Sequence, residues 1–298
     1  GADGPFFLWL HYMDAHTPYV PAPRYIREVA DDRFGTHRML HAHVRTGLGW
    51  DVGDGTLRDL RTLYQAAVRQ VDDSVGRVLD ALEAAGVADE TAVVLAGDHG
   101  EEFQDHGHLA HYPKLYDELI RVPLIVDVPG EEGRRVDGQV GLDAIPPTVA
   151  ELLGVEPPDA WTGASLAPVV RDGAAPPDDP VVSVTVRGDS VTSQPIPTAL
   201  DDGDLLVSVR DRDWTYVANV ADDAEELYHR PTDAGQHRDL STATTGEAPA
   251  VRERFAAIAR DHAEAIRAAA ADGEETRDAD GGDVDEDVAT RLAALGYR

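Results

Sequence analysis

Cysteine is absent from the 298 residues of the chain. Disulfide bonds and thiolate metal ligands are therefore excluded, and the redox compartment stays undetermined. Long apolar runs are also lacking, because no stretch approaches the ~20 apolar residues that a membrane-spanning helix needs. No signal peptide is visible, and we expect a cytoplasmic protein. The chain starts at Gly1 rather than at a methionine, so an upstream start stays open.

Basic residues are scarce. Lys and Arg number 26 against 56 Asp and Glu, which gives a formal net charge of -30. A chain of this charge lacks the basic footprint that nucleic acid requires, and an anionic membrane surface would repel it, so neither is expected as a partner. The acidic residues are spread along the chain, which is typical of a surface adapted to high salt, as in a halophilic archaeon. An acidic protein from a mesophile is the alternative.

The most informative stretch runs from Thr91 to Val126. Its first part, 92–96, is a short apolar run closed by a glycine, which predicts a buried strand. Asp98 and His99 follow at the carboxyl end of that strand, where open α/β sheets place their ligands. A carboxylate beside an imidazole suits a divalent metal ion. A second apolar run, 122–128, predicts the return strand.

Further candidate side chains follow this pair: His106, His108, His111 and Lys114. Lys114 is the only lysine of the chain. Arginine stands at every other position with a Lys or Arg side chain, which indicates that the compact ammonium of lysine is needed at position 114. Such a cation would suit a bound oxyanion. The alternative is that Asp-His-Gly forms an ordinary turn and that each histidine is a solvated loop residue. The single lysine favours a site.

An apolar and aromatic run from Pro5 to Tyr12 predicts a central strand. It ends in a loop restricted by prolines, so that His16 also emerges at a strand end. A loop histidine bonded to the backbone is the alternative for His16. The stretch 31–55 is predicted to be a loop, and no pattern fixes the geometry of its histidines.

Helical spacing of apolar residues predicts two helices in the larger part of the chain. The first begins with a capping box formed by Thr56 and Asp59 and ends at Gly86. The second runs from Leu142 to Leu153, with prolines near its start, where they are tolerated.

Composition divides the chain into a larger part, 1–171, a linker, 172–180, a small subdomain, 181–271, and an acidic tail, 272–298. The linker is rich in Gly, Ala, Pro and Asp, which are typical of connecting segments. The subdomain is predicted to combine strands with a helix. The tail is predicted to end in a short amphipathic helix.

Within the small subdomain, alternating apolar residues predict strands at 181–187 and 205–220, with a hairpin turn at 211–213. A helix is predicted from Pro249 to Ala271. The acidic, Gly-rich stretch 272–287 is predicted to be disordered, because it holds too few apolar residues to form a core.

Several stretches match segments of one known family. GDHGEEFQDHGH, followed by PKLYDELIRVPLIV, resembles the second metal-binding segment of the sulfatase family, within the alkaline-phosphatase-like superfamily. FFLWLHYMDAHTPYVPAPRY resembles the strand and substrate-binding histidine loop of that family. GLDAIPPTVAELLGVEPPDAWTGASLAPVV resembles its helix and G-x-S-L turn, and ELYHRPTDAGQHRDLS resembles its C-terminal signature in degraded form. The resemblance implies an α/β sulfatase sheet with flanking helices, incomplete at the N-terminus, plus a small C-terminal α+β appendage.

The resemblance also implies a function. Sulfatases are metal-dependent hydrolases of sulfate monoesters, usually with calcium, and their nucleophile is a formylglycine. On matching positions, Asp98 and His99 are metal ligands, Lys114 and His16 are catalytic and substrate-binding residues, and His111 is a further substrate-binding candidate. Many sulfatases have asparagine where His99 stands. Histidine at this position is shared with phosphonate and phosphate monoester hydrolases of the superfamily, which often use manganese or another transition metal.

Two features of the family have no match in the printed sequence. These are the first metal-binding Asp pair and the C/S-x-P-x-R nucleophile motif, because Ser193-Gln194-Pro195 lacks the arginine. We therefore expect the C-terminal portion of a sulfatase, inactive by itself, with the formylglycine upstream and a small-molecule or carbohydrate sulfate ester as substrate. A phosphonate or phosphate monoester hydrolase and an inactive truncated remnant are the alternatives. The oligomeric state is not indicated.

Overall fold

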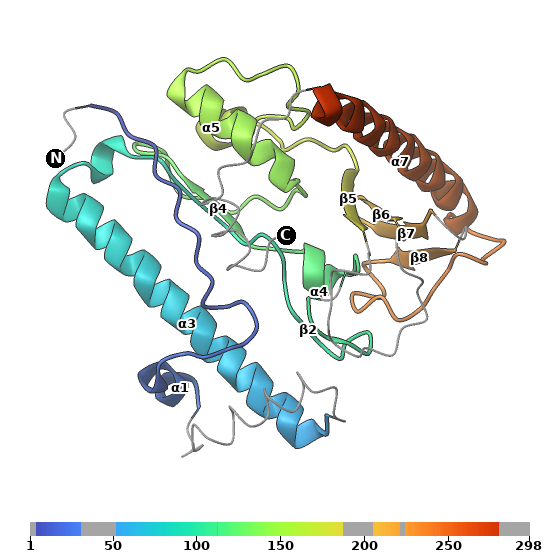
Figure 1. The fold of residues 1–298 in the computed structure, drawn as a ribbon, viewed down its shortest axis with the longest axis horizontal. Helices are drawn as coiled ribbons and strands as arrows, with labels where there is room; N and C mark the ends of the chain where they lie inside the picture. Colours follow the sequence, from blue (N-terminus) through green and yellow to red (C-terminus); the bar gives the residue numbers. More distant parts are fainter. Residues whose placement is uncertain (1–3, 31–51, 112, 187–204, 221–223, 280–298) are drawn as a thin grey trace.

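The structure is a computed structural model, and it describes residues 4–30, 52–111, 113–186, 205–220 and 224–279. Figure 1 shows two parts side by side: a larger part along the long helix α3, and a smaller part in which helix α7 covers a sheet. No helix in the described ranges is both long and apolar enough to cross a membrane.

Helix α3 (Asp54–Ala85) forms one side of the larger part (Figure 1). Its N-cap is Gly53 and no side chain caps its start, so the predicted capping box of Thr56 and Asp59 is wrong. Asp59 is buried at 4% exposure rather than turned back over the helix end. The predicted end is confirmed, because Gly86 adopts a left-handed φ of 71° and its N–H caps the last carbonyls.

The apolar face of α3 packs on helix α1 (Pro23–Val29) and on side chains from both flanking loops. The buried members of this core are Tyr19, Tyr25, Ile26, Leu60, Leu63, Ala66 and Phe103. The packing fixes the loop after residue 16 against α3, because the ring of Tyr19 lies edge-on to that of Tyr64 and tilted against that of Phe103. The stretch 31–51, predicted to be a loop, lies outside the described residues.

Strand β1 (Val93–Ala96) pairs antiparallel with strand β4 (Leu124–Asp127), so that both predicted strands are present. The expectation that the first of them is buried is wrong, because its residues are half-buried or exposed. Ile125 on β4 is 58% exposed. Within the described residues these two strands pair only with each other, so neither becomes the interior strand that would be covered on both faces.

The segment from Pro5 to Tyr12 is extended but is not a strand, which corrects the prediction of a central strand. In the described part of the chain no other segment pairs with it in a sheet. Its large side chains remain exposed, with Phe7 at 70% and Trp9 at 74%. An apolar run predicts extended backbone, but a strand also requires a neighbour to take its backbone hydrogen bonds.

The second predicted helix is confirmed as α5 (Ile145–Leu153), preceded by the 3₁₀ turn η2 (Leu142–Ala144) and ended by Gly154 in the left-handed region. The following turn closes back on this helix, because the Leu166 N–H donates to Thr148 Oγ1 at 2.7 Å. Helix α6 (Ala167–Asp172) then leads out of the larger part.

The smaller part is a four-stranded antiparallel sheet in chain order, made of β5 (Val181–Val186), β6 (Leu205–Arg210), β7 (Trp214–Asn219) and β8 (Glu225–His229). The predicted strands and the hairpin turn between β6 and β7 are confirmed. Strand β8 is not among the predicted strands, because its sequence Glu-Glu-Leu-Tyr-His does not alternate.

Helix α7 (Ala248–Ala279) covers one face of this sheet (Figure 1). It extends beyond the predicted end at Ala271, so the prediction of disorder is wrong for residues 272–279. The predicted helix at the end of the chain lies outside the described residues. The division of the chain into domains stays a prediction.

The short helix α4 (Asp117–Ile120) joins the two parts. Its residue Ile120 packs against a cluster formed by Leu115, which precedes the helix, and by Leu206 and Val217 of the sheet. Its carboxylate Asp117 accepts a hydrogen bond from Arg210 at 3.0 Å and lies 3.8 Å from Arg230. Burial lowers the pKa of Arg210 to about 10, although Asp117 acts to raise it.

Replacement of Phe255 by alanine tests the packing of α7 on the sheet. Phe255 is fully buried at 0% exposure, so we expect Phe255→Ala to lower the free energy of unfolding by about 3–5 kcal/mol. The measurement is urea denaturation followed by circular dichroism. Glu253→Ala, an exposed position on the same helix, is the control and should change stability by less than ~0.5 kcal/mol. Equal effects of the two variants would contradict this packing.

Candidate active site

Strand β1 ends at Ala96, and Gly97 leads from it to a bend at Asp98, which His99 follows. Asp98 Oδ1 accepts the His99 backbone N–H at 2.9 Å, and His99 Nδ1 donates to the Gly100 carbonyl at 2.9 Å. Asp98 Oδ2 then lies 3.9 Å from His99 Nε2. The chain bends at Asp98, and these hydrogen bonds hold the carboxylate and the imidazole side by side.

Gly100 is required where this bend meets α4. Its N–H donates to the Leu119 carbonyl at 2.7 Å. A Cβ atom at this position would lie 2.0 Å from the Glu118 carbonyl oxygen. Only glycine fits so close an approach of two backbones, and the approach ties the candidate site to the helix that joins the two parts.

Three imidazoles meet beyond this bend. The ring of His111 lies 4.5 Å from that of His99 and 4.5 Å from that of His16, and the outer two rings are 6.2 Å apart. Burial and the neighbouring His111 lower the pKa of His16, which favours its neutral form with a free lone pair. The structure thus brings together three histidines that are 83 and 12 positions apart along the chain.

Each of these imidazoles has its Nδ1 atom turned to an oxygen acceptor. His16 Nδ1 lies 2.5 Å from the Thr17 carbonyl oxygen, and His99 Nδ1 donates to the Gly100 carbonyl. His111 Nδ1 lies 2.7 Å from Glu101 Oε1. Because a carbonyl oxygen only accepts, the hydrogen of His16 and of His99 sits on Nδ1, and their Nε2 atoms carry the lone pairs.

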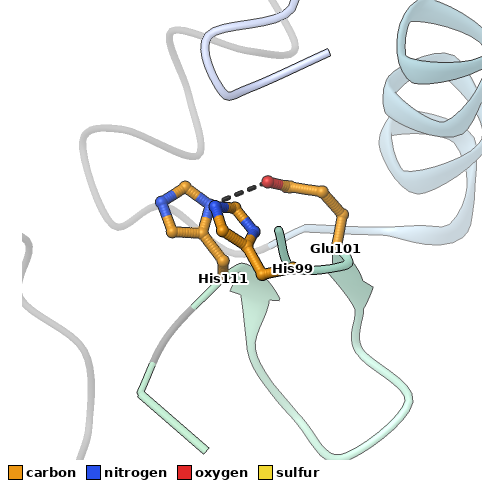
Figure 2. Close-up of side chains that lie close together, drawn as sticks. All are labelled: His99, Glu101 and His111. Carbon is orange, nitrogen blue, oxygen red and sulfur yellow. Dashed lines mark hydrogen bonds and ion pairs between the residues drawn. The ribbon is translucent and has the colours of Figure 1, made fainter. Parts of the chain in front are cut away.

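Glu101 is not among the residues that the sequence predicts for the site. Its side chain is 4% exposed, and Figure 2 shows its carboxylate turned toward His111, with His99 beside them. Its other oxygen, Oε2, accepts a hydrogen bond from the hydroxyl of Tyr19. The acidic pair Glu101-Glu102 is visible in the sequence, but periodicity does not tell which of the two carboxylates faces the histidines.

A short hairpin brings Glu101 and His111 face to face. Strand β2 (Glu102–Phe103) pairs antiparallel with strand β3 (Leu109–Ala110), with Glu102 opposite Ala110. Glu101 and His111 are the next residues outward from that pair and so lie at its open end. Ala110 adopts a left-handed φ of 64°, a conformation that is strained for a residue with a side chain and that is common at functional sites.

Glu102 holds the tip of this hairpin. It is fully buried, and its Oε1 accepts the backbone N–H groups of His106 at 2.8 Å and His108 at 2.7 Å. Lys114 is tied to the same tip, because its Nζ donates to the His106 carbonyl at 2.9 Å. Lys114 thus lies beside the hairpin, and its described contacts do not include the three imidazoles.

His106 connects the hairpin with the smaller part. Its Nδ1 lies 2.5 Å from Glu118 Oε1, its Nε2 lies 3.0 Å from the Gln236 carbonyl oxygen, and its ring stacks on Tyr116 at 3.7 Å. Burial alone would lower the pKa of His106, but the hydrogen bonds to Glu118 and Gln236 and the nearby carboxylates raise it overall. A protonated His106 donates to both acceptors.

A cavity of 1690 Å³ opens at the site and reaches the smaller part. Its lining includes the predicted residues Asp98, His99, His111 and Lys114, together with residues of β5. Side chains from both parts of the chain can therefore meet one ligand there.

The donors at this site suit a divalent metal ion. His99, Glu101 and His111 each offer one ligand atom, and these atoms lie within 4.8 Å of one another. The carboxylate of Asp98 adds an anionic oxygen beside His99. Imidazole nitrogens with carboxylate oxygens are donors that manganese, zinc and iron accept, whereas calcium prefers oxygen alone.

The fold is of the alkaline-phosphatase-like α/β type, and the comparison with known families agrees. The family model described as "Sulfatase" matches residues 1–155. The chain therefore belongs to the sulfatase family, as the resemblance implies.

One curated relative is the multifunctional alkaline phosphatase superfamily protein PehA of Trinickia caryophylli. It is 32% identical over 203 residues, and the match covers 58% of this chain and 39% of that protein. The chain thus spans about two fifths of the length of this relative.

Solved structures share the fold. A phosphonate monoester hydrolase, SpPMH from Silicibacter pomeroyi, superposes with a TM-score of 0.59 at 24% identity, over 82% of this chain and 48% of that one. A protein solved in complex with its substrate D-glucosamine-2-N,6-O-disulfate gives a TM-score of 0.58 at 22% identity, over 77% of this chain and 46% of that one. These likenesses confirm the predicted fold class.

The contact made by His106 predicts a pH dependence of stability. The pKa of His106 in the folded chain is raised above its ordinary value of 6.5. Its contribution to stability is therefore full below pH 6.5 and is lost as the pH rises through the folded-state value. The groups facing it are Glu118, Glu102, His237 and Tyr116. We expect the free energy of unfolding to fall over this pH interval.

The measurement is urea denaturation at a series of pH values from acid to alkaline of this interval. His106→Gln should flatten the pH dependence, whereas His11→Gln, at an exposed position, should leave it unchanged. A pH dependence that is the same in wild type and His106→Gln would contradict the assignment.

Proposed function

We propose that this chain provides the metal-binding and ester-binding half of a metal-dependent hydrolase of sulfate monoesters. The observation that carries the proposal is the convergence of His16, His99 and His111 beside Asp98, at the end of β1. The sulfatase family model, which matches residues 1–155, supports the same chemistry.

Asp98 and His99 would hold a divalent cation through Oδ2 and Nε2, which lie 3.9 Å apart. When bound, such a cation neutralises negative charge on the ester oxygens and makes the central atom more electrophilic. The bend that fixes Asp98 and His99 orients these two ligands before the metal arrives. Calcium is the usual ion of the family, but the imidazole donor favours manganese or another transition metal.

His16 and Lys114 are the proposed catalytic residues, and with His111 they would contact the ester. Neutral His16 carries a lone pair at Nε2, where it can take up a proton and then donate that proton to the leaving oxygen. The ammonium of Lys114 lines the same cavity, although it is hydrogen-bonded to the His106 carbonyl. A change of rotamer would be needed for its charge to reach a bound oxyanion.

Turnover in sulfatases requires a formylglycine nucleophile. None of the 298 residues matches its motif, so the proposal assigns binding of metal and ester to this chain and assigns the nucleophile to residues outside the printed sequence. The cavity of 1690 Å³ is large enough for a carbohydrate, and one structural neighbour was solved with a disulfated glucosamine. A small-molecule or carbohydrate sulfate ester is therefore the proposed substrate.

A phosphonate or phosphate monoester hydrolase is the second candidate. His99 stands where many sulfatases have asparagine, and a relative at 32% identity bears the name of a multifunctional phosphatase-superfamily protein. A solved phosphonate monoester hydrolase also shares the fold. Sulfate and phosphate esters are both tetrahedral oxyanions, and the described contacts do not distinguish them.

Removal of the two proposed metal ligands tests the site directly. We expect the double variant Asp98→Ala, His99→Ala to bind manganese and calcium at least 10-fold more weakly than wild type, because both donors beside β1 are lost. The measurement is isothermal titration calorimetry on the metal-free chain. Asp89→Ala removes an exposed carboxylate of η1 (Ala88–Glu90) and serves as the control. Equal metal affinity in the double variant and wild type would contradict the proposal that Asp98 and His99 bind the metal ion.

Relative rates on aryl sulfate, aryl phosphate and aryl phosphonate separate the two hydrolase candidates. The test requires a form of the protein that carries the nucleophile motif. We expect the sulfate ester to be preferred, and a preference for either phosphorus ester would replace the sulfatase proposal with the second candidate. If this form hydrolyses none of the three, the remaining alternative is a binding protein, in which Lys114→Ala would still weaken sulfate binding.

A further inference from the structure

His111 occupies the centre of the imidazole cluster. Its ring lies 4.5 Å from His16 and 4.5 Å from His99, whereas those two rings are 6.2 Å from each other. His111 can present either a hydrogen or a lone pair to a ligand, depending on which of its two nitrogens carries the hydrogen. That choice is made by the hydrogen-bond partner of the other nitrogen.

The partner is Glu101, and both oxygens of its carboxylate are engaged. Oε1 faces His111 Nδ1 at 2.7 Å, and Oε2 accepts the hydroxyl of Tyr19, which is itself 3% exposed. Burial and the carboxylate of Glu101 raise the pKa of Tyr19, so the hydroxyl keeps its hydrogen and remains a donor. A buried carboxylate with a donor on each oxygen is a satisfied anion.

Glu101 could act on a metal in two ways. As a direct ligand it would bind the metal through the second lone pair of an oxygen that already has His111 or Tyr19 as its hydrogen-bond partner. As an orienting group it keeps both bonds. The β2–β3 hairpin places Glu101 opposite His111. The arrangement in which Glu101 orients His111 is therefore already present in the folded chain. Carboxylates placed behind a metal-binding histidine act in this way.

We propose that Glu101 is a positioning residue that holds His111 as the Nδ1–H tautomer, so that Nε2 is the nitrogen available to a divalent metal ion. Tyr19 anchors the carboxylate from the other side. The role of the metal rests on the proposed function and makes His111 a metal ligand beside Asp98 and His99 rather than a contact of the ester, whereas the tautomer does not depend on either role. His16 and His99 are held in the same tautomer by backbone carbonyls, and His111 is the member of the cluster that depends on a side chain.

The tautomer is measured directly in the metal-free chain. Two-dimensional ¹⁵N–¹H spectra of histidine-labelled protein report which ring nitrogen carries the hydrogen. Assignment uses a His111→Gln variant, whose missing signal identifies the residue. We expect neutral His111 to carry its hydrogen on Nδ1 in wild type. A hydrogen on Nε2 would overturn the proposal, and this outcome needs no variant of Glu101 to fold.

Two substitutions of Glu101 then separate an orienting group from a direct ligand. Glu101→Gln keeps an acceptor oxygen for His111, so we expect the Nδ1–H tautomer to persist and manganese affinity to stay within a few-fold of wild type. Glu101→Met removes the acceptor, so we expect the tautomer to shift and the affinity to fall about 10–100-fold. An equal loss of affinity in both variants, with the tautomer of Glu101→Gln unchanged, would identify a direct ligand and overturn the proposal.

A second carboxylate–histidine pair supplies the matched control. Glu118 lies 2.5 Å from His106 and has 18% side-chain exposure. Glu118→Gln and Glu118→Met should leave both the His111 tautomer and manganese affinity unchanged, even where they lower stability. Loss of manganese affinity in Glu118→Met equal to that in Glu101→Met would reduce the role of Glu101 to general structural support and overturn the proposal. Failure of ester hydrolysis would refute the proposed function while leaving the tautomer result standing.

Discussion

Two adjacent buried carboxylates, Glu101 and Glu102, are the constraint on which the rest of the site depends. Burying an anion raises the free energy of the folded state unless hydrogen-bond donors surround it. The net charge of -30 adds repulsion between carboxylates. Each carboxylate has its own donors, although Oε2 of Glu102 is buried without a hydrogen-bond partner among the described residues. Glu101 takes His111 and Tyr19, and Glu102 takes the backbone N–H groups at the hairpin tip. The first set orders the imidazole cluster, and the second orders the loop to which Lys114 is bonded.

The same hairpin links the site to the smaller part of the molecule. His106 at its tip contacts Glu118 on α4 and the Gln236 carbonyl beyond β8. Asp117, also on α4, receives Arg210 from the sheet. Removing one partner of a buried ion pair leaves the other charge unpaired, which costs more than the pair itself contributes. These hydrogen bonds therefore join the sheet, α4 and the hairpin that carries His111.

Membership in the sulfatase family gives these contacts their chemical meaning. Nitrogen donors held with their lone pairs free, a carboxylate beside one of them and a cation nearby are the components that a charged ester and a metal ion require. The proposed division of labour assigns metal binding to Asp98 and His99 and ester binding to His16 and Lys114. Glu101 sets the working nitrogen of His111. These roles predict different losses on substitution, so metal affinity, ester preference and tautomer report on them separately.

The sequence by itself determined the family, the fold class and most of the elements. The signals for these elements are local: the apolar runs, the glycines after α3 and α5, and the alternation of apolar residues between 181 and 220. Local signals can be recognised from the sequence because they depend only on residues that are near one another along the chain. It also pointed to Asp98, His99 and His111, which share one short stretch.

Tertiary structure decided the features that depend on residues distant in the sequence. The apolar segment 5–12 pairs in a sheet with no other described residue, so it is not a strand. Glu101 became part of the site because a hairpin and Tyr19, 82 residues away, turned its carboxylate inward. Hydrogen bonds between distant residues have no period in the sequence, and for that reason the role of Glu101 was visible only in the folded chain.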